Sequence, residues 1–356
     1  MTELLVGTKK GLIVLRGARG GGATEIAMRS FPGEVVEFAL RDPRSGRYFA
    51  AVTHGQFGPH LFYADDPAGT WRQAEGPAFP PGAGASVERI WVVEPGVADG
   101  EMWCGVAPAA LFRSGDGGKT WALVQGLWDV PTRPQWEGGA GGLCLHSICP
   151  WPGDPQQLAV GISSAGVWLT NDAGRSWRRG VGGLVPRYLP EEAREGTHNY
   201  CVHNLRRAPQ QPSTLYMQFH GGVYRSDDAG ESWIDIGTGR GLPSDFGFPL
   251  AIDAHDPDRA FVIPLAADAD RVTADGRVRV YETRDRGESW RALEAGLPQS
   301  QAYLTVLRQA FCSDGGKPLG LYFGAQSGEV FGSTDGGRTW STIATHLPSV
   351  ASVRVS

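Results

Sequence analysis

The sequence predicts an all-β protein, a seven-bladed β-propeller of four-stranded antiparallel blades, and three observations lead to this prediction. The motif Ser/Thr-x-Asp-x-Gly-x-Ser/Thr-Trp recurs five times in 356 residues, at 114–121, 170–177, 226–233, 283–290 and 333–340. Its tryptophans are 56, 56, 57 and 50 residues apart, a period typical of propellers and solenoids. The 51 glycines and 25 prolines separate many short apolar runs, and only residues 190–195 resemble a short helix.

Each copy of the motif predicts a turn between two strands. The aspartate can accept backbone N–H groups a few residues further on, and the glycine two places later permits a positive φ. The tryptophan begins the next strand and can pack its ring against a neighbouring sheet. We therefore interpret the five aspartates as structural residues; they are Asp116, Asp172, Asp228, Asp285 and Asp335.

The number of blades follows from the copies and from the two ends of the chain. A degenerate copy at 64–71 gives a sixth blade. Residues 4–15 resemble the middle of a blade without its first strand, and residues 350–355 resemble an opening strand. We therefore expect residues 350–356 to complete the N-terminal blade. Because radial repetition lets every sheet bury both faces, residues 1–356 are expected to form a single domain.

Composition restricts the classes of partner and the compartment. The formal net charge is −5 and no block of Lys or Arg occurs, so nucleic acid and anionic membranes are not expected partners. The chain enters a strand at once and has no apolar run of about 18 residues. Five cysteines without CxxC spacing indicate reduced thiols. These features predict a cytoplasmic protein.

The repeated motif resembles the Asp-box, or BNR repeat, of sialidases, xyloglucan-active glycosidases, sortilin-type receptors and photosystem II assembly factors. The resemblance implies that the boxes lie on outer hairpins, and that ligands bind at the opposite end of the central channel. It does not extend to classical sialidase activity, because the chain lacks a Phe-Arg-Ile-Pro segment and only Arg89 opens a first strand. Residues 135–147 and 245–249 more closely resemble intracellular bacterial propellers that carry BNR-repeat or glycosyl-hydrolase labels.

Ionisable residues occupy equivalent positions in four successive predicted blades. Six residues before the proline that ends each first strand stand Glu37, Arg89, His146 and His203. Packing alone would favour apolar residues there. We expect these side chains on the ligand face, together with His54 and His220, which close second strands, and with His60 near the rim.

Long connections precede two of these strands. Residues 127–142 lead to His146 and residues 184–199 lead to His203, and loops of this length are often lids or binding loops. The first loop offers Trp136 as an aromatic wall and Glu137 as a carboxylate. Asp245 is expected to face the channel just before the sixth blade, and the insertion 266–277 is expected to be a solvated rim loop.

Two chemistries and one structural interpretation fit this set. His146, His203, His220 and His54 could bind Zn²⁺, Mn²⁺ or Fe²⁺, and the metal could polarise a substrate or activate water. Without a metal, His146 and His203 could act as general acid and base, with Glu137 and Asp245 as catalytic carboxylates. Alternatively, each histidine is only hydrogen-bonded in a polar channel.

The sequence therefore predicts binding of a small-molecule ligand in the central channel, with hydrolase or lyase chemistry. This chemistry would depend on a divalent metal if the histidines bind one. Glu37, Arg89, His54, His60, Trp136 and His220 are the ligand-binding candidates. One alternative is a non-catalytic propeller that recognises a protein partner. Another is a glycoside hydrolase, which would need two carboxylates about 5 to 10 Å apart, drawn from Glu37, Glu137 and Asp245.

Overall fold

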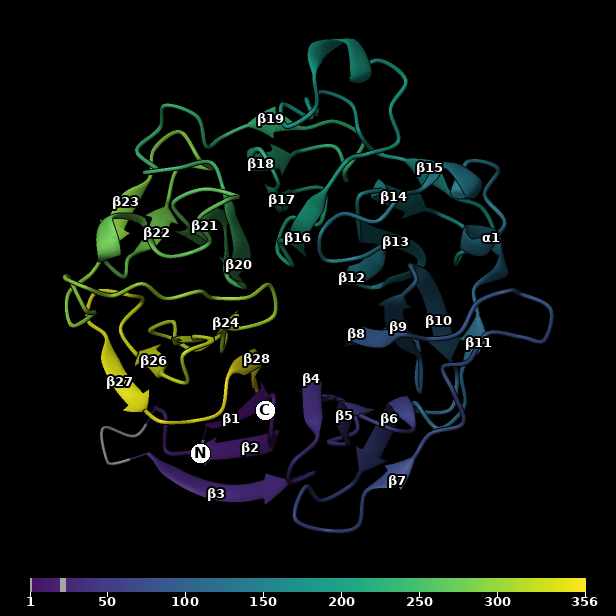
Figure 1. The fold of residues 1–356 in the computed structure, drawn as a ribbon, viewed down its shortest axis with the longest axis horizontal. Coiled ribbons are helices and arrows are strands. Elements are labelled where there is room, and N and C mark those ends of the chain that lie inside the picture. Colours follow the sequence, from purple (N-terminus) through teal and green to yellow (C-terminus); the bar gives the residue numbers. More distant parts are fainter. Residues whose placement is uncertain (1, 20–23) are drawn as a thin grey trace.

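Seven four-stranded antiparallel sheets surround a central axis in the computed structural model, which describes residues 2–19 and 24–356 (Figure 1). The predicted seven-bladed propeller is confirmed. The first three blades contain β28 (Val350–Val355), β1 (Glu3–Thr8), β2 (Gly11–Arg16) and β3 (Glu25–Ser30); β4 (Val35–Arg41), β5 (Tyr48–His54), β6 (Gly58–Ala64) and β7 (Arg72–Gln73); and β8 (Arg89–Pro95), β9 (Met102–Ala107), β10 (Ala110–Ser114) and β11 (Ala122–Leu123).

The other four blades follow in chain order. They contain β12 (Cys144–Trp151), β13 (Asp154–Ser163), β14 (Gly166–Thr170) and β15 (Arg178–Arg179); β16 (Val202–Arg207), β17 (Leu215–Phe219), β18 (Gly222–Ser226) and β19 (Ile234–Asp235); β20 (Gly247–Asp253), β21 (Asp256–Pro264), β22 (Val280–Thr283) and β23 (Arg291–Leu293); and β24 (Phe311–Ser313), β25 (Leu321–Gly324), β26 (Val330–Ser333) and β27 (Ser341–Ala344).

Helices are short and lie in the connections. They are α1 (Gln125–Trp128), η1 (Arg133–Gln135), η2 (Glu191–Ala193) and η3 (Ala274–Gly276). The helix expected at 190–195 is thus a single 3-10 turn. Within the described ranges, no helix has the length and apolar character needed to cross a membrane.

The ring closes through its last strand. β28 pairs antiparallel with β1, with Leu4 opposite Val355 and Val6 opposite Val353. Val350 and Val353 are almost fully buried, so the strand contributes both backbone pairing and apolar burial. Figure 1 shows the N- and C-terminal segments side by side in this blade. The prediction that the C-terminal residues complete the N-terminal blade is confirmed.

The repeated motif forms the turn that its residues predict. In the fifth blade, Ser232 N donates to Asp228 Oδ1 at 2.9 Å, and Gly230 adopts a φ of 101°. The first serine of the motif adds a contact that we did not foresee: Ser226 Oγ donates to Asp228 Oδ1 at 2.7 Å and accepts from Gly230 N at 2.8 Å. Both ends of the turn are therefore tied by side chains rather than by a strand ladder.

Strand register separates the two ends of the channel. Cys144 at the start of a first strand pairs with Ser163 at the end of a second strand, and Val202 likewise pairs with Phe219. At the opposite edge, Leu215 pairs with Ser226, where a repeated turn begins. The repeated turns therefore lie at one end of the channel, and the starts of the first strands lie at the other.

Candidate functional site

A thiol and two imidazoles meet at the end of the channel away from the repeated turns. Cys201 Sγ and one ring nitrogen each of His203 and His220 lie within 4.8 Å of one another. Cys201 and His203 flank the start of β16, and His220 directly follows β17. Because His220 N donates to Cys201 O at 3.0 Å, strand pairing itself brings the three residues together.

A β-bulge positions His203. The register between β16 and β17 shifts between Val202 and Asn204, so His203 is the extra residue. First strands of other blades have a shift at the corresponding place, at Glu37, Trp91 and His146. A bulge re-aims the side chain that it carries, and bulges are common beside functional sites. In the third blade the bulge holds Trp91, so Arg89 stands two residues earlier and is not the structural equivalent of His203.

Each imidazole of the cluster has one nitrogen anchored. His203 Nδ1 lies 2.6 Å from Gly247 O, and because a carbonyl only accepts, Nδ1 carries the proton. His220 Nε2 lies 3.4 Å from Asp268 Oδ2. These contacts leave His203 Nε2 and His220 Nδ1 to face Cys201. Anchoring of the second nitrogen by a carbonyl or a carboxylate is typical of histidines that bind metals.

Protonation states also suit metal ligands. Burial disfavours the thiolate of Cys201, but the imidazoles of His203 and His220 beside it hold the pKa of this thiol well below its usual range. Burial lowers the pKa of His203, which keeps its imidazole neutral. A thiolate and neutral imidazoles are the forms that coordinate a metal ion.

A cavity of about 180 Å³ opens beside the cluster. Three loops supply its walls: the Gly139–Gly141 segment, the loop ending at Asn199, and the insertion that carries Asp268 and Arg271. Tyr188 fixes the base of the second loop, since its hydroxyl donates to Asn199 O at 2.8 Å and accepts from Cys201 N at 2.7 Å. The two long loops and the insertion therefore border the cavity, and the insertion, which is exposed at 267–271, also contributes Asp268 and Arg271 to its wall.

Arg308 lies between this cavity and a second one. It lines both the first cavity and a neighbouring cavity of about 240 Å³ that also contains Glu37 and Arg89. Its guanidinium stacks over Phe248 at 4.8 Å and Trp91 at 5.7 Å. Across residues 2–19 and 24–356, that guanidinium makes no hydrogen bond or ion pair, and its Nε is buried without a partner. An uncommitted cation thus stands next to the thiol and imidazole cluster.

The second cavity contains the predicted pair Glu37 and Arg89 in contact with each other. Glu37 Oε1 lies 3.3 Å from Arg89 Nε, and Glu37 Oε2 lies 3.8 Å from Lys9 Nζ. Arg89 also stacks on Trp91 at 4.9 Å. Glu37 is therefore neutralised by two cations and shares a cavity with Arg308.

The predicted histidines divide into two groups. His203 and His220 join the cluster, whereas His146 is fully buried with Nε2 at 2.9 Å from Val202 O and Nδ1 at 3.0 Å from Ser147 Oγ. His54 lies on the second blade, where its Nδ1 accepts from Gln56 N and its Nε2 is 3.5 Å from Glu34. His60 lies on β6 with Nδ1 at 3.2 Å from Gly58 O.

The remaining candidates lie outside the cluster as well. Trp136 is buried against Trp168, with ring centroids 5.1 Å apart, and so packs in the core rather than forming a ligand wall. Glu137 is exposed on its loop. Asp245 Oδ2 lies 3.4 Å from Thr238 Oγ1, and burial together with the nearby Asp235 raises the pKa of Asp245.

Sequence reasoning missed three residues of the site: Cys201, Asp268 and Arg308. The Cys-x-His spacing at 201–203 was a usable signal, because a thiol and an imidazole so close in sequence are candidate metal donors. Asp268 and Arg308 carried no such signal. Each reaches the site from a separate connection, so only the folded ring brings it to Cys201.

The fold and the cavity define the class: a seven-bladed propeller with a donor cluster at one end of its channel. The chain matches no family model. It is 25% identical over 225 residues to an oligoxyloglucan-reducing end-specific xyloglucanase of Emericella nidulans, which covers 54% of this chain and 25% of that protein. A probable enzyme of the same kind from Neosartorya fischeri is 23% identical over 284 residues, 69% of this chain and 31% of that protein. The matches thus span about a third or less of those proteins.

Solved structures share the propeller fold at low sequence identity. An ancestral GH74 enzyme superposes with a TM-score of 0.56 at 14% identity over 90% of this chain and 38% of that chain. Apo AztD from Citrobacter koseri gives 0.55 at 11% identity over 100% and 98% of the two chains. YCF48 bound to D1 peptide gives 0.53 at 14% identity over 86% and 84%.

Proposed function

We propose that Cys201, His203 and His220 bind one Zn²⁺ and that the site hydrolyses a small anionic molecule. The observation that supports this most directly is the anchoring of both imidazoles, at Gly247 O and Asp268 Oδ2, which directs their other nitrogens at Cys201. A histidine held only for structure needs no such convergence on a thiol.

The donor set favours zinc among divalent metals. A thiolate is a soft ligand that suits Zn²⁺, whereas Mn²⁺ prefers carboxylate and water oxygens. Zinc sites with three protein ligands keep a fourth position for water, which the metal acidifies towards neutral pH. The adjoining cavity of about 180 Å³ leaves room for a substrate at that position.

Arg308 supports an anionic substrate. Arg271, the other guanidinium of the cavity, already lies 2.5 Å from Asp268, whereas the Arg308 guanidinium is uncommitted and stacked on aromatic rings. A planar guanidinium in an enclosed cavity is suited to bidentate binding of a carboxylate or a phosphate. Arg308 would hold the anionic group while the bond to be cleaved lies beside Cys201, His203 and His220.

Two further inferences concern classification. The repeated turns and the weak similarity to xyloglucanases support placing the chain among the Asp-box propellers. Hydrolysis of a glycoside has less support from the arrangement of carboxylates, since Glu37 is paired with Arg89, Glu137 is exposed, and Asp245 contacts Thr238.

Metal analysis of untagged protein tests the proposal. We expect about one equivalent of zinc in the wild type, loss of zinc in a Cys201→Ser/His203→Ala double variant, and affinity weakened roughly 10- to 100-fold in Asp268→Asn because His220 loses its anchor. His54→Ala is the matched control, since His54 lies outside the cluster, and it should retain zinc. Folded wild-type protein without zinc affinity, or a double variant that binds zinc normally, would contradict the proposal.

Hydrolysis is tested separately with small carboxylate and phosphate esters. Activity should disappear on chelation and return with zinc. Arg308→Gln should raise KM for anionic esters, with a smaller effect on uncharged ones, because it removes an anion contact and not a metal ligand. Equal effects on charged and uncharged esters would exclude the assigned role of Arg308.

A further inference from the structure

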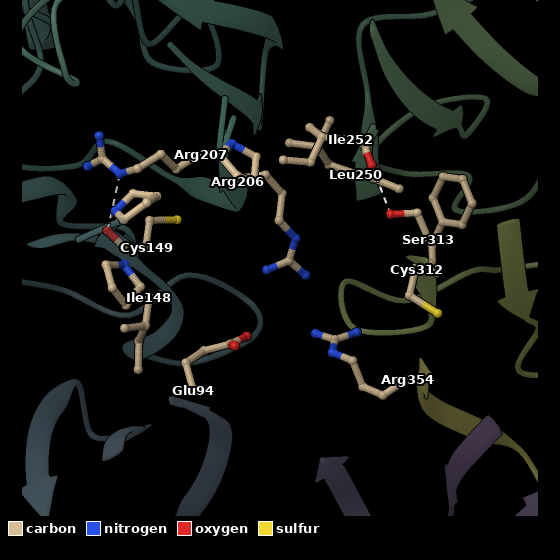
Figure 2. A pocket seen from close by; sticks show the side chains of 15 residues that line it. Glu94, Ile148, Cys149, Arg206, Arg207, Leu250, Ile252, Cys312, Ser313 and Arg354 are labelled. Carbon is tan, nitrogen blue, oxygen red and sulfur yellow. Dashed lines mark hydrogen bonds between the residues drawn. The ribbon is translucent and has the colours of Figure 1, made fainter. Parts of the chain in front are cut away.

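A third cavity, of about 320 Å³, lies at the opposite end of the channel, the end that carries the repeated turns. Figure 2 shows its lining, which comes from the innermost strands of six blades. Glu94 on β8, Arg206 on β16 and Arg354 on β28 extend from three sides into the same space. This site shares no residue with the cavity that contains Cys201.

The three arginines of this cavity differ in how many contacts they make with the rest of the protein. Arg207 stacks over Trp151 at 4.9 Å and donates to the carbonyls of Cys149 and Pro212, so its role is structural. Arg354 donates through Nη1 to Gln309 O at 2.9 Å and to Val353 O at 3.0 Å, donates through Nη2 to Gln309 Oε1, and stacks over Phe38 at 4.8 Å. Its guanidinium is therefore held mostly by the fold. Arg206 makes a single long contact, from Nη2 to Gln309 Oε1 at 3.4 Å. Arg206 is therefore largely free to bind a ligand.

Glu94 has no partner of its own. Among the residues that the structure describes, its carboxylate makes no hydrogen bond and no ion pair within 4.0 Å, although two guanidinium groups face the same space. Burial raises the pKa of Glu94, and burial also lowers the pKa of Arg354 to about 10. Charges removed from bulk water without a close partner are costly. A ligand with both signs of charge would relieve this cost on both sides.

The remaining wall is apolar. Pro150, Pro152, Pro209 and Ile252 line the cavity and keep accessible surface. Ser313 Oγ donates to Ile252 O at 2.8 Å, so its hydroxyl is already used. The cavity thus presents separate cationic, anionic and apolar surfaces around one space.

We propose that this cavity binds an α-amino acid with an apolar side chain. Arg206 would bind the carboxylate next to the positive charge of Arg354, Glu94 would receive the ammonium group, and the apolar wall would contact the side chain. A simple carboxylate or inorganic phosphate would satisfy the arginines but would be repelled by Glu94. An amine without a carboxylate would pair with Glu94 but would be repelled by the two arginines. Complementarity to both charges is what selects the zwitterion.

Calorimetry with the full-length protein and three related probes tests this inference. L-leucine carries both charges, isocaproate lacks the ammonium group, and isoamylamine lacks the carboxylate. We expect the wild type to bind leucine and to bind each of the other two at least about tenfold more weakly, because one charged group of the cavity is then left without a partner. Absence of leucine binding at millimolar concentrations, or equal binding of isocaproate, would overturn the proposal.

Two variants assign the binding to named residues. Glu94→Gln should weaken leucine binding at least about tenfold and strengthen isocaproate binding, because the anionic repulsion disappears. Arg206→Gln should weaken both. Thermal unfolding of each variant verifies folding, and His54→Ala, which alters a partly exposed residue at the other end of the channel, is the matched control with unchanged leucine affinity. If Glu94→Gln lowered both affinities in a folded protein, the assignment of the ammonium group to Glu94 would be wrong.

Discussion

Asp228 shows how a single side chain fixes the connection between two strands. Its Oδ1 accepts from Ser226 Oγ at 2.7 Å and from Ser232 N at 2.9 Å, so one carboxylate closes the turn at both ends. The side chain is exposed, and its role is therefore in hydrogen bonding and not in burial. The pattern of the motif predicted the bond from Ser232 N, which lies four residues further on, but not the bond from Ser226 Oγ.

Replacing Asp228 with Ala is expected to lower the free energy of unfolding by about 1 to 2 kcal/mol, because turn donors lose their acceptor. Urea unfolding measures this change. Asp270→Ala is the control, since the Asp270 carboxylate makes no hydrogen bond or ion pair in the described ranges. The control should change stability by less than about 0.5 kcal/mol. Equal losses in the two variants would show that the turn hydrogen bonds contribute nothing specific.

The hairpin turns act as equivalent elements. Hydrogen bonds from the turn lower the pKa of the aspartate in all five copies, against opposing burial in most of them. In the fourth blade, the hydroxyl and N–H of Ser176, followed by the hydroxyl of Thr170, lower the pKa of Asp172 to about 2. The ionised form is thus favoured by folding in each hairpin.

This linkage gives the stability a defined dependence on acid. The Asp172 carboxylate titrates near pH 4 in the unfolded chain and near 2 in the folded one. Its contribution is therefore complete above about pH 4 and is lost as the pH falls through about 2. Asp172→Asn should have a lower Tm than the wild type at neutral pH, and the difference should shrink in acid. A Tm difference that stays constant down to about pH 2 would contradict the linkage.

First strands show where an alignment based on sequence is limited. Alignment through the terminal proline placed Arg89 with His146 and His203, but the bulge in β8 holds Trp91. A bulge adds a residue without a strong local signature, so positions counted from a distant proline shift. His146 and His203 do occupy equivalent bulges, yet their ring nitrogens meet different partners.

The whole ring depends on the pairing of its two ends. β28 brings Val350 and Val353 into the core, and its Arg354 donates to Gln309 O at 2.9 Å on the seventh blade. Without this strand, β1 would present an unpaired edge and the neighbouring blades would lose packing. Closure therefore stabilises blades that are distant in sequence.

Deletion of residues 350–356 is accordingly expected to lower Tm much more than Asp228→Ala does, and to increase aggregation through the exposed edge. Differential scanning fluorimetry and light scattering measure the two effects. Deletion of Ser356 alone is the control, since β28 ends at Val355. A truncated chain that melts like the full one would show that β28 does not close the ring.

At the scale of the molecule, the sequence by itself determined the number of blades, the positions of the turns and the closure. These features depend on contacts between residues close in sequence. The same contacts recur in each repeat, so the sequence carries the same signal several times. The same logic identified which end of the channel carries the first-strand histidines.

Only the tertiary structure decided which of those residues come together in the cluster. His146 contacts Val202 O through Nε2 and Ser147 Oγ through Nδ1. His203 donates through Nδ1 to Gly247 O, which leaves its other nitrogen on the side of Cys201. The difference comes from the next blade and from Asp268, Arg308 and Tyr188, which lie on separate connections. First-strand histidines of different blades occupy equivalent positions in the repeat. Their chemistry differs because the closed ring places different side chains around each of them.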